Sequence, residues 1–463
     1  MIRQENGVFC VETRNTGYYI APRGPLAEQL HYGWKIRPSV EVLRQPVAVA
    51  YGTDVIYDKE TDPNLSLLHL GLELSPTEKG DFRRGALNLT LGNGSRVCDL
   101  RFAGAEILPQ PPETPGLPTA RESGECLVLR FESGEGVLAE LCYIPFEDCD
   151  VILRQLRLTN RTDGPVTLHR AMSYQLDLPR QDLLLTTLNG AWAREFEPST
   201  TPVRPGLTAF GSVSGTSSHY CNPFFALSAP ETGEHTGEIY GFNLIYSGSH
   251  GASVEMDCYG FTRVMAGIQE EGFGWTLQPG ECFATPQAVL TFSGEGRNGL
   301  RYNMHRFVTE HILPPRWREE PRPVLVNNWE ATYFDFTPRK LKALAAKAAG
   351  LGAELFVLDD GWFGERHSTQ NGLGDWYVNE GKFPNGLEEL IGAVKDLGMM
   401  FGLWVEPEMV NPKAQLYQDH PDWIYHYKTR VSDTSRVQYV LNVTKPEVRE
   451  FIYNMLDNLL TKY

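Results

Sequence analysis

The chain has 463 residues, of which 41% are hydrophobic and 22% are charged, and it carries a formal net charge of −16. This length predicts two or three globular domains, and the negative charge argues against a nucleic-acid or anionic-membrane partner, which would need a broad basic face. We find no signal peptide and no run of about 20 apolar residues, so we expect no membrane span. The eight cysteines show no zinc spacing, which predicts reduced thiols, no metal site and a cytoplasmic location.

Residues 1–320 are predicted to form one β-rich domain. Alternating apolar and polar residues over 126–146 form two runs joined by Ser-Gly-Glu-Gly, which is typical of a hairpin. The same pattern recurs over 151–178, with Asp163-Gly164-Pro165 as the turn, and no convincing long amphipathic helix precedes about residue 297. Many strands separated by Gly and Pro turns predict a large antiparallel β-sandwich.

Residues 321–463 change period after a Pro- and Arg-rich connector over 312–323. Short apolar runs alternate here with segments whose apolar residues recur every three or four positions. We expect strands at VLVNNW, LFVL and MMFGLWV, and helices after Thr337-Pro338, at LEELIGAVKDLG and over 446–460. This order predicts parallel strands with right-handed crossovers, and therefore the first part of a (β/α)₈ barrel.

Polar and aromatic residues follow each of these three strands. The segments are Asn327-Asn328-Trp329-Glu330, Asp359-Asp360-Gly361-Trp362 and Trp404-Val405-Glu406-Pro407-Glu408. A (β/α)₈ barrel builds its site at the carboxyl ends of its strands, so we expect these residues to form a partly hydrated, ligand-binding mouth.

The second region is shorter than a complete barrel. Residues 321–463 hold about three β/α units, whereas a (β/α)₈ barrel needs roughly 200–250 residues. Three units leave a strand edge unpaired, so we expect that the sequence is C-terminally incomplete. The alternative is a small open α/β sheet that is complete as it stands.

The strand-end residues suit sugar binding better than bond cleavage. Glycoside hydrolysis needs two carboxyl groups flanking the bond, and neighbouring strand residues such as Asp359 and Asp360 point to opposite sides. Ionised carboxylates can instead accept hydrogen bonds from sugar hydroxyls, while Trp329, Trp362 and Trp404 can stack on a pyranose. Two alternatives are a helix-capping or ion-pair role for the two aspartates and a hard-cation site that also uses Glu406 and Glu408.

Long segments of the chain resemble the α-galactosidases of glycoside hydrolase family 36. They include NNWEATYFDF, LFVLDDGWFGERH, GDWYVNEGKFPNGL, FGLWVEPEMVNP, KGDFRRGALNLTLGNGSRVCDLRF and GAWARE. The resemblance implies an N-terminal β-supersandwich before a (β/α)₈ barrel, with release of α-linked galactose from melibiose- and raffinose-type sugars. It also implies retention of configuration and no cofactor.

The resemblance also implies roles for individual residues. Asp359 and Asp360 would bind the galactose hydroxyls, and Trp329, Trp404 and Arg436 would line the same pocket. The segments YGTDVIYD and GAWARE contain Asp54 and Trp192, which match positions that bacterial members lend to a neighbouring subunit. This implies a homo-oligomer, often a tetramer, with pocket residues shared between subunits.

Both catalytic carboxylates of the family lie in motifs that this sequence lacks. The nucleophile belongs to a Lys-Trp-Asp-Met-Asn motif and the acid/base to a later Ser-Asp-x-Thr-Asp-like motif, neither of which occurs in 1–463. We therefore expect both aspartates beyond Tyr463 and no turnover by this chain alone. Two other functions remain open: a non-catalytic galactoside-binding protein, and an α-galactosyl transferase of the raffinose- and stachyose-forming type.

Overall fold

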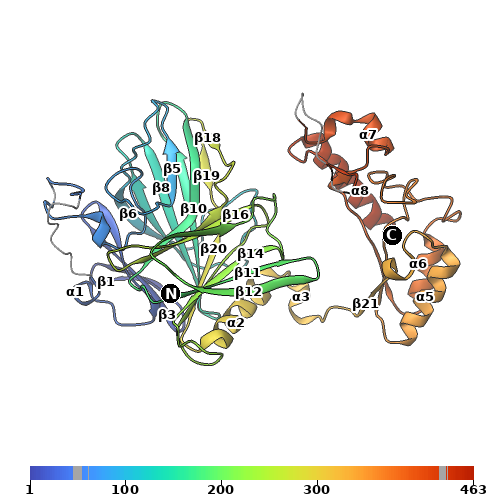
Figure 1. Cartoon of the computed structure of the whole chain (residues 1–463), viewed down its shortest axis with the longest axis horizontal. Helices are drawn as coiled ribbons and strands as arrows, with labels where there is room; N and C mark the ends of the chain where they lie inside the picture. The colour runs from blue at the N-terminus through green and yellow to red at the C-terminus, as the bar shows by residue number, and fades with distance from the viewer. Residues whose placement is uncertain (45–54, 61, 427–433, 435) are drawn as a thin grey trace. The chain divides into compact units, whose positions relative to one another are not determined.

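The computed structural model describes the chain except for residues 45–54, 61, 427–433 and 435. The chain divides into two compact units, Met1–Arg318 and Glu319–Tyr463 (Figure 1), and the division lies two residues before the boundary expected from the change of period. Among the described residues, no helix combines the length and the apolar character needed to cross a membrane.

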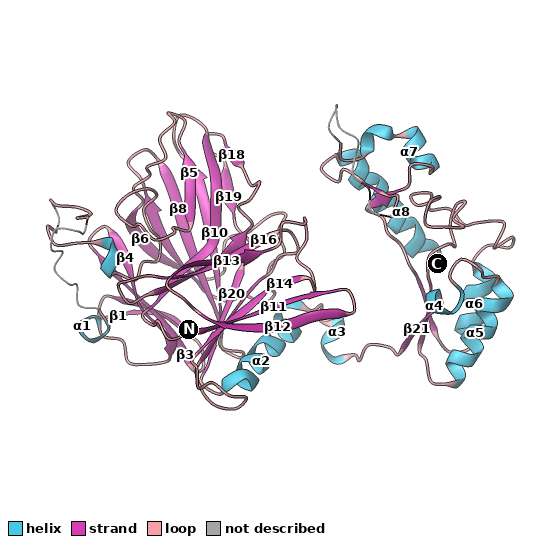
Figure 2. Ribbon diagram, in the orientation of Figure 1, coloured by secondary structure: helices cyan, strands magenta, loops and turns pink. Residues whose placement is uncertain are grey.

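The first unit consists almost entirely of antiparallel strands (Figure 2). A four-stranded sheet contains, in order, β1 (Ile2–Glu5), β2 (Val8–Glu12), β3 (Thr16–Arg23) and β4 (Leu26–Trp34). A six-stranded sheet runs β13 (Gly206–Gly211), β16 (His250–Met256), β17 (Thr262–Ile268), β10 (Val166–Leu178) and β18 (Trp275–Leu277), with β5 (Leu87–Thr90) also paired to β10.

A ten-stranded sheet completes this unit. Its order is β12 (Arg194–Pro202), β11 (Leu184–Ala191), β14 (Cys221–Ser228), β15 (Ile239–Leu244), β20 (Ala288–Ser293), β9 (Val151–Asn160), β8 (Val137–Phe146), β7 (Cys126–Glu132) and β6 (Arg101–Leu108), with β19 (Cys282–Ala284) paired to β9. The helical segments are α1 (Val40–Leu43), η1 (Leu67–His69), α2 (Gly296–Phe307), the π-helix η2 (Val308–Ile312) and α3 (Arg316–Glu319), the last of which ends one residue into the second unit.

The middle of the ten-stranded sheet is buried on both faces. Alternate residues of β7 belong to different cores: Leu127 and Leu129 lie in the main sandwich core, and Cys126 and Val128 lie in a second cluster with Phe307 of α2. Because side chains alternate across a strand, a strand covered on both sides needs apolar residues at nearly every position. This double cover explains the almost continuous apolar run in β7.

The structure confirms the predicted β-rich first region, and its described residues contain no long helix before α2, but one predicted hairpin is wrong. β7 and β8 pair as expected, whereas β9 and β10 do not pair with each other. β9 pairs with β8 and β20 in the large sheet, and β10 pairs with β17 in the six-stranded sheet. The Asp163-Gly164-Pro165 turn therefore carries the chain from one sheet to the other.

The second unit contains the predicted parallel strands. β21 (Leu325–Asn327), β22 (Leu355–Leu358) and β23 (Met400–Leu403) pair in that order, both pairs parallel. The remaining elements are α4 (Trp329–Thr332), α5 (Pro338–Gly350), α6 (Glu388–Asp396), β24 (Met409–Val410), α7 (Gln415–Asp419), η3 (Pro421–Trp423), β25 (Tyr439–Val440) and α8 (Pro446–Lys462).

Local sequence explains where the predicted helix α5 begins. The Thr337 side chain accepts a hydrogen bond from the Lys340 N–H, and Pro338 occupies the first helical position, where its missing N–H costs nothing. Leu341 and Ala345 of α5 are buried and share a core with Leu390 and Val394 of α6. The helices thus cover the sheet and leave the carboxyl ends of its strands to form the site.

Candidate active site

Hydrogen bonds tie the ends of the three parallel strands together. Beyond the last residue of β21, the Asn328 side-chain oxygen accepts from the Asp359 N–H at 2.7 Å. Beyond β23, the Trp404 N–H donates to the Leu358 carbonyl at 2.9 Å. Since adjacent parallel strands end at the same sheet edge, the segments after β21, β22 and β23 converge there, as the sequence predicted.

Asp359 is half-buried, and its carboxylate is oriented by two hydrogen bonds. One oxygen accepts from the Asn327 side-chain amide at 2.5 Å, and the other accepts from the Asp360 N–H at 2.6 Å. A carboxylate has about four acceptor positions, so each oxygen keeps capacity for a ligand hydroxyl. This geometry suits an oriented sugar-binding group.

Asp360 lies in a different environment from its neighbour. It is buried, and its two carboxylate oxygens accept hydrogen bonds from Arg366 Nε and Nη2, both at 2.8 Å. Arg366 is itself fully buried and also donates to the Asn411 side chain at 2.8 Å. The expectation that both aspartates are partly hydrated is therefore wrong for Asp360, because a bidentate ion pair compensates its burial.

The tryptophans divide into two groups. Trp362 is fully buried and donates its indole N–H to the Trp404 carbonyl at 2.9 Å, so the idea that it stacks on a sugar is wrong. Trp329, the first residue of α4, and Trp404 are half-buried. Each retains exposed ring surface at the strand ends, as an aromatic platform for a ligand requires.

Glu406 follows Trp404 by two residues and has an unusual environment. It is half-buried, and one carboxylate oxygen has no hydrogen-bond partner within the described part of the chain. Burial raises the pKa of Glu406, although the positive charge of Arg436 partly opposes this shift. Arg436 is exposed, in a turn before β25. The sequence placed Glu406 among the strand-end residues expected at the mouth and in the alternative cation site, but the family resemblance assigned it no role in binding the sugar.

The alternative of a hard-cation site finds little geometric support. Asp359, Asp360, Glu406 and Glu408 supply no group of three ligand atoms close enough to hold one ion, judged on the described residues. The ion pair between Asp360 and Arg366 also places a cation where a metal would have to bind.

Two basic residues of this site were missed by the sequence reasoning. Arg366 is one, and the other is Lys382, whose ammonium donates to the carbonyls of Gly361 (2.9 Å) and Phe334 (3.1 Å). Burial lowers the pKa of Lys382 to about 8. Gly361 has φ +100°, and a side chain there would lie 2.9 Å from the Phe334 ring, which explains the glycine after the two aspartates.

Asp54 and Trp192 are the two residues of the first region that the resemblance assigned to a pocket, and the structure describes only the second. Asp54 lies outside the described residues. Trp192 lies between β11 and β12, where its side chain is 83% exposed. The residues that the structure brings to one sheet edge are Trp329, Asp359, Asp360 and Trp404, with Arg436 electrostatically coupled to Glu406 nearby.

Comparisons with known proteins match both units. The family model described as Glycosyl hydrolase family 36 N-terminal domain matches residues 26–278, and the model described as Melibiase matches residues 282–463. The chain is 42% identical over 405 residues to α-galactosidase AgaA of Geobacillus stearothermophilus, covering 86% of this chain and 56% of AgaA. It is 36% identical to α-galactosidase Mel36A of Lactobacillus acidophilus, covering 98% of this chain and 63% of Mel36A.

Solved structures give the same result. A structure of Geobacillus stearothermophilus AgaA in complex with stachyose matches with a TM-score of 0.94 and 38% identity, covering 98% of this chain and 64% of that one. The α-galactosidase of Lactobacillus brevis matches with a TM-score of 0.93, 37% identity, and coverage of 98% and 62%. The chain thus spans between about half and two thirds of the length of these relatives.

Proposed function

The chain belongs to glycoside hydrolase family 36, and we propose on this basis that it is part of a retaining α-galactosidase acting on terminal α-linked galactose. The observation that carries the proposal is the convergence of Trp329, Asp359 and Trp404 at the ends of three parallel strands. The related AgaA has been solved with stachyose and with raffinose, which supports melibiose- and raffinose-type galactosides as the substrate class.

The proposed binding mode divides the work between the two aspartates. The oriented carboxylate of Asp359 accepts hydrogen bonds from galactose hydroxyls, and such charge-assisted bonds are stronger than neutral ones. Asp360 contacts the same sugar from a position held by Arg366, so little conformational entropy is lost on binding. Trp329 and Trp404 pack against the apolar C–H face, and Arg436 completes the pocket.

We do not assign the catalytic step to any carboxylate within 1–463. A retaining mechanism needs a nucleophile and an acid/base about 5 Å apart across the anomeric carbon. Asp360 is neutralised by Arg366, and Asp359 shares a hydrogen bond with Asp360's own backbone. Both catalytic aspartates are therefore proposed to lie in family motifs that this sequence does not contain, so that residues 1–463 alone have no turnover.

The partners and location are proposed with the same function. A largely exposed tryptophan at the β11–β12 turn suits insertion into a neighbouring subunit, so we infer a homo-oligomer, possibly a tetramer, in which Trp192 and Asp54 reach another subunit's pocket. All eight cysteines are free, which supports the proposed reducing, cytoplasmic location.

The test is to read the source gene past the codon for Tyr463 and to express the complete frame. We expect hydrolysis of p-nitrophenyl α-galactoside with the α-anomer of galactose formed first by NMR, and none by residues 1–463. Galactoside binding by a complete frame that never turns over would favour the non-catalytic function. Oligosaccharide products exceeding free galactose at high acceptor concentration would favour the transferase. A complete frame inert toward every α-galactoside, in binding and in turnover, would overturn the proposal.

A further inference from the structure

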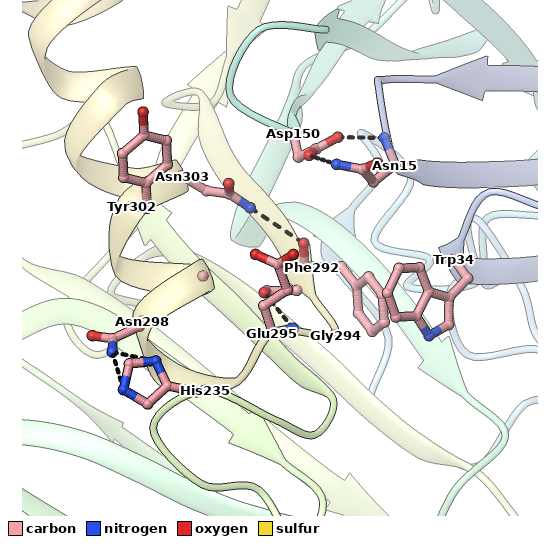
Figure 3. Close-up of a pocket in the computed structure, with 12 residues that line it drawn as sticks. Asn15, Trp34, Asp150, His235, Phe292, Gly294, Glu295, Asn298, Tyr302 and Asn303 are labelled. Atoms are coloured by element: carbon pink, nitrogen blue, oxygen red, sulfur yellow. Dashed lines mark hydrogen bonds between the residues drawn. The ribbon is translucent and has the colours of Figure 1, made fainter.

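A pocket of about 400 Å³ opens in the first unit, where segments distant in sequence meet (Figure 3). Asn15 comes from the β2–β3 turn, Trp34 from the end of β4, Asp150 from the residue before β9, and Asn303 from α2. Pockets of roughly 300–1,000 Å³ are typical of small-molecule sites. We call this the Trp34 pocket; it includes none of the strand-end residues described above.

One wall of the Trp34 pocket is a rigidly held aromatic surface. The Trp34 indole N–H donates to Glu238 at 3.1 Å, and its ring meets Phe292 edge-on with centroids 5.4 Å apart. A β-carbon on Gly294 would lie only 1.8 Å from the indole, so this glycine lets the ring rest on the backbone. The side chain is nonetheless 45% exposed, so a fixed apolar face remains available to a ligand.

The other wall carries hydrogen-bond acceptors that nothing in the described structure occupies. The Asn15 N–H and side-chain amide both donate to Asp150 at 2.8 Å, and the Asn303 amide donates to Thr291 at 3.1 Å. Within the described ranges, the side-chain oxygens of Asn15 and Asn303 and the carboxylate of Glu295 have no hydrogen-bond or ion-pair partner. The fixed amides thus leave their oxygens as acceptors for a donor from outside.

The charge of the lining restricts the ligand class. No lysine or arginine is among the described residues that line the Trp34 pocket, and its histidine, His235, is engaged by Asn298 at 3.0 Å. An anionic ligand would meet carboxylates without a compensating cation. A pyranose instead combines hydroxyl donors for the acceptors with a C–H face for the indole.

We propose that the Trp34 pocket binds a neutral pyranose unit of an oligosaccharide. Its ring lies against Trp34, and its hydroxyls donate to Glu295, Asn15 and Asn303. Such a site would hold sugar chains on the first unit independently of the strand-end site. The inference does not depend on the proposed α-galactosidase activity, because it uses residues of the first unit alone.

The experiment measures sugar binding by the 463-residue chain, with Asp359→Asn in the background to weaken the strand-end site. The probes are methyl α-D-galactopyranoside and methyl α-D-glucopyranoside, and their binding is measured by saturation-transfer NMR and calorimetry. We expect saturable binding with a Kd of about 1 mM, corresponding to roughly −4 kcal/mol. Trp34→Ala should weaken it at least tenfold, and Glu295→Gln about threefold.

Trp275→Ala is the matched control, because Trp275 is 51% exposed in the same unit but does not line the Trp34 pocket. It should leave the Kd unchanged. Glu295 is exposed, so Glu295→Gln tests the site even if Trp34→Ala disturbs folding, which circular dichroism would reveal. No saturable binding at about 50 mM sugar, fifty times a millimolar Kd, would overturn the proposal. Equal affinities in Glu295→Gln, Trp275→Ala and the parent would overturn it as well.

Discussion

In the first unit, the fully buried Arg263 lies between two carboxylates, whereas at the strand ends of the second unit Asp359 is only half-buried and keeps acceptor capacity. Arg263 contacts Asp177 at 2.6 and 2.8 Å and Asp81 at 2.9 Å, and all three side chains are excluded from solvent. Asp360 with Arg366 follows the same closed pattern inside the site itself. The difference suggests that the fully paired charge around Arg263 supports the fold, while the partly paired carboxylate of Asp359 is left for a ligand. Asp360 combines the two, because it is paired with Arg366 and is also proposed to contact the sugar.

The largest expected effect comes from breaking the closed network of the first unit. Arg263→Met leaves Asp177 buried without its main partner and weakens the compensation of Asp81. Removing one member of a buried ion pair costs about 3–5 kcal/mol, so we expect a destabilisation of that size in urea unfolding. Arg161→Met is the control, because its pair with Glu132 is more than half exposed and such pairs contribute about 0–1 kcal/mol. Equal losses in the two variants would break the comparison.

A second prediction concerns a buried group of the first unit that lacks an opposite charge. His250 is buried, and its nearest polar partners are the neutral Ser217 hydroxyl and Cys221 thiol, so burial lowers its pKa to about 4. The unfolded chain binds this proton near pH 6.5 and the folded chain only near pH 4, so stability falls as the pH drops between these values. The loss is at most about 3 kcal/mol, since one pKa unit is worth about 1.4 kcal/mol.

The measurement for His250 is the free energy of unfolding from pH 7 to pH 4, compared with His250→Gln. Glutamine can replace the hydrogen bond to Ser217 but cannot titrate. We therefore expect the variant to lose less stability on acidification than the parent. Parallel pH profiles for the two proteins would show that His250 does not carry this dependence.

Asp359→Asn tests whether the partly paired carboxylate at the strand ends serves a ligand and not the stability of the fold. The replacement removes a charge that no cation in the second unit pairs with among the described residues, so we expect a stability change below about 1 kcal/mol. Galactoside affinity should fall about tenfold or more, because hydrogen bonds to a charged acceptor contribute about 1.5–3 kcal/mol. The readout is calorimetric titration of the complete-frame protein with 1-deoxygalactonojirimycin. A stability loss as large as that of Arg263→Met would instead class Asp359 as structural.

Local sequence predicted most of the second unit, because its signals act over short distances. Thr337-Pro338 sets the start of α5, and the apolar spacing of Leu390, Ile391 and Val394 sets the buried face of α6. The convergence of the strand-end residues followed from the parallel order alone. Only the family resemblance pointed to Asp54, Trp192 and Arg436 as pocket residues. Each is an isolated residue outside the predicted helices and strands, so no periodic pattern of apolar residues indicates its role.

The sequence did not predict which distant residues and strands pair with each other. Nothing in the pattern of 151–178 distinguishes a hairpin from a crossing between two sheets, because the strands have the same alternation in both cases. Likewise, Arg366 lies six residues after Asp360 on an irregular loop, where no period indicates that the two side chains meet. The different burial of Asp359 and Asp360 depends on this contact and so became visible only in three dimensions.

The smallest expected effect belongs to Glu406. Removing the charge of Glu406 should stabilise the fold, whereas removing the charge of Arg263 should destabilise it. Burial raises the pKa of its carboxyl, so the ionised form destabilises the folded chain once the pH exceeds the unfolded value near 4.5. Glu406→Gln should therefore stabilise the second unit at pH 7 and stabilise it less near pH 4, where the acid is mostly protonated in both states. Urea unfolding at the two pH values measures this difference. A gain of stability at pH 7 together with weaker galactoside binding would show that the site keeps a destabilising charge because the ligand needs it. A loss of stability at pH 7 would instead show that the Glu406 carboxylate stabilises the fold, as the buried ion pairs do.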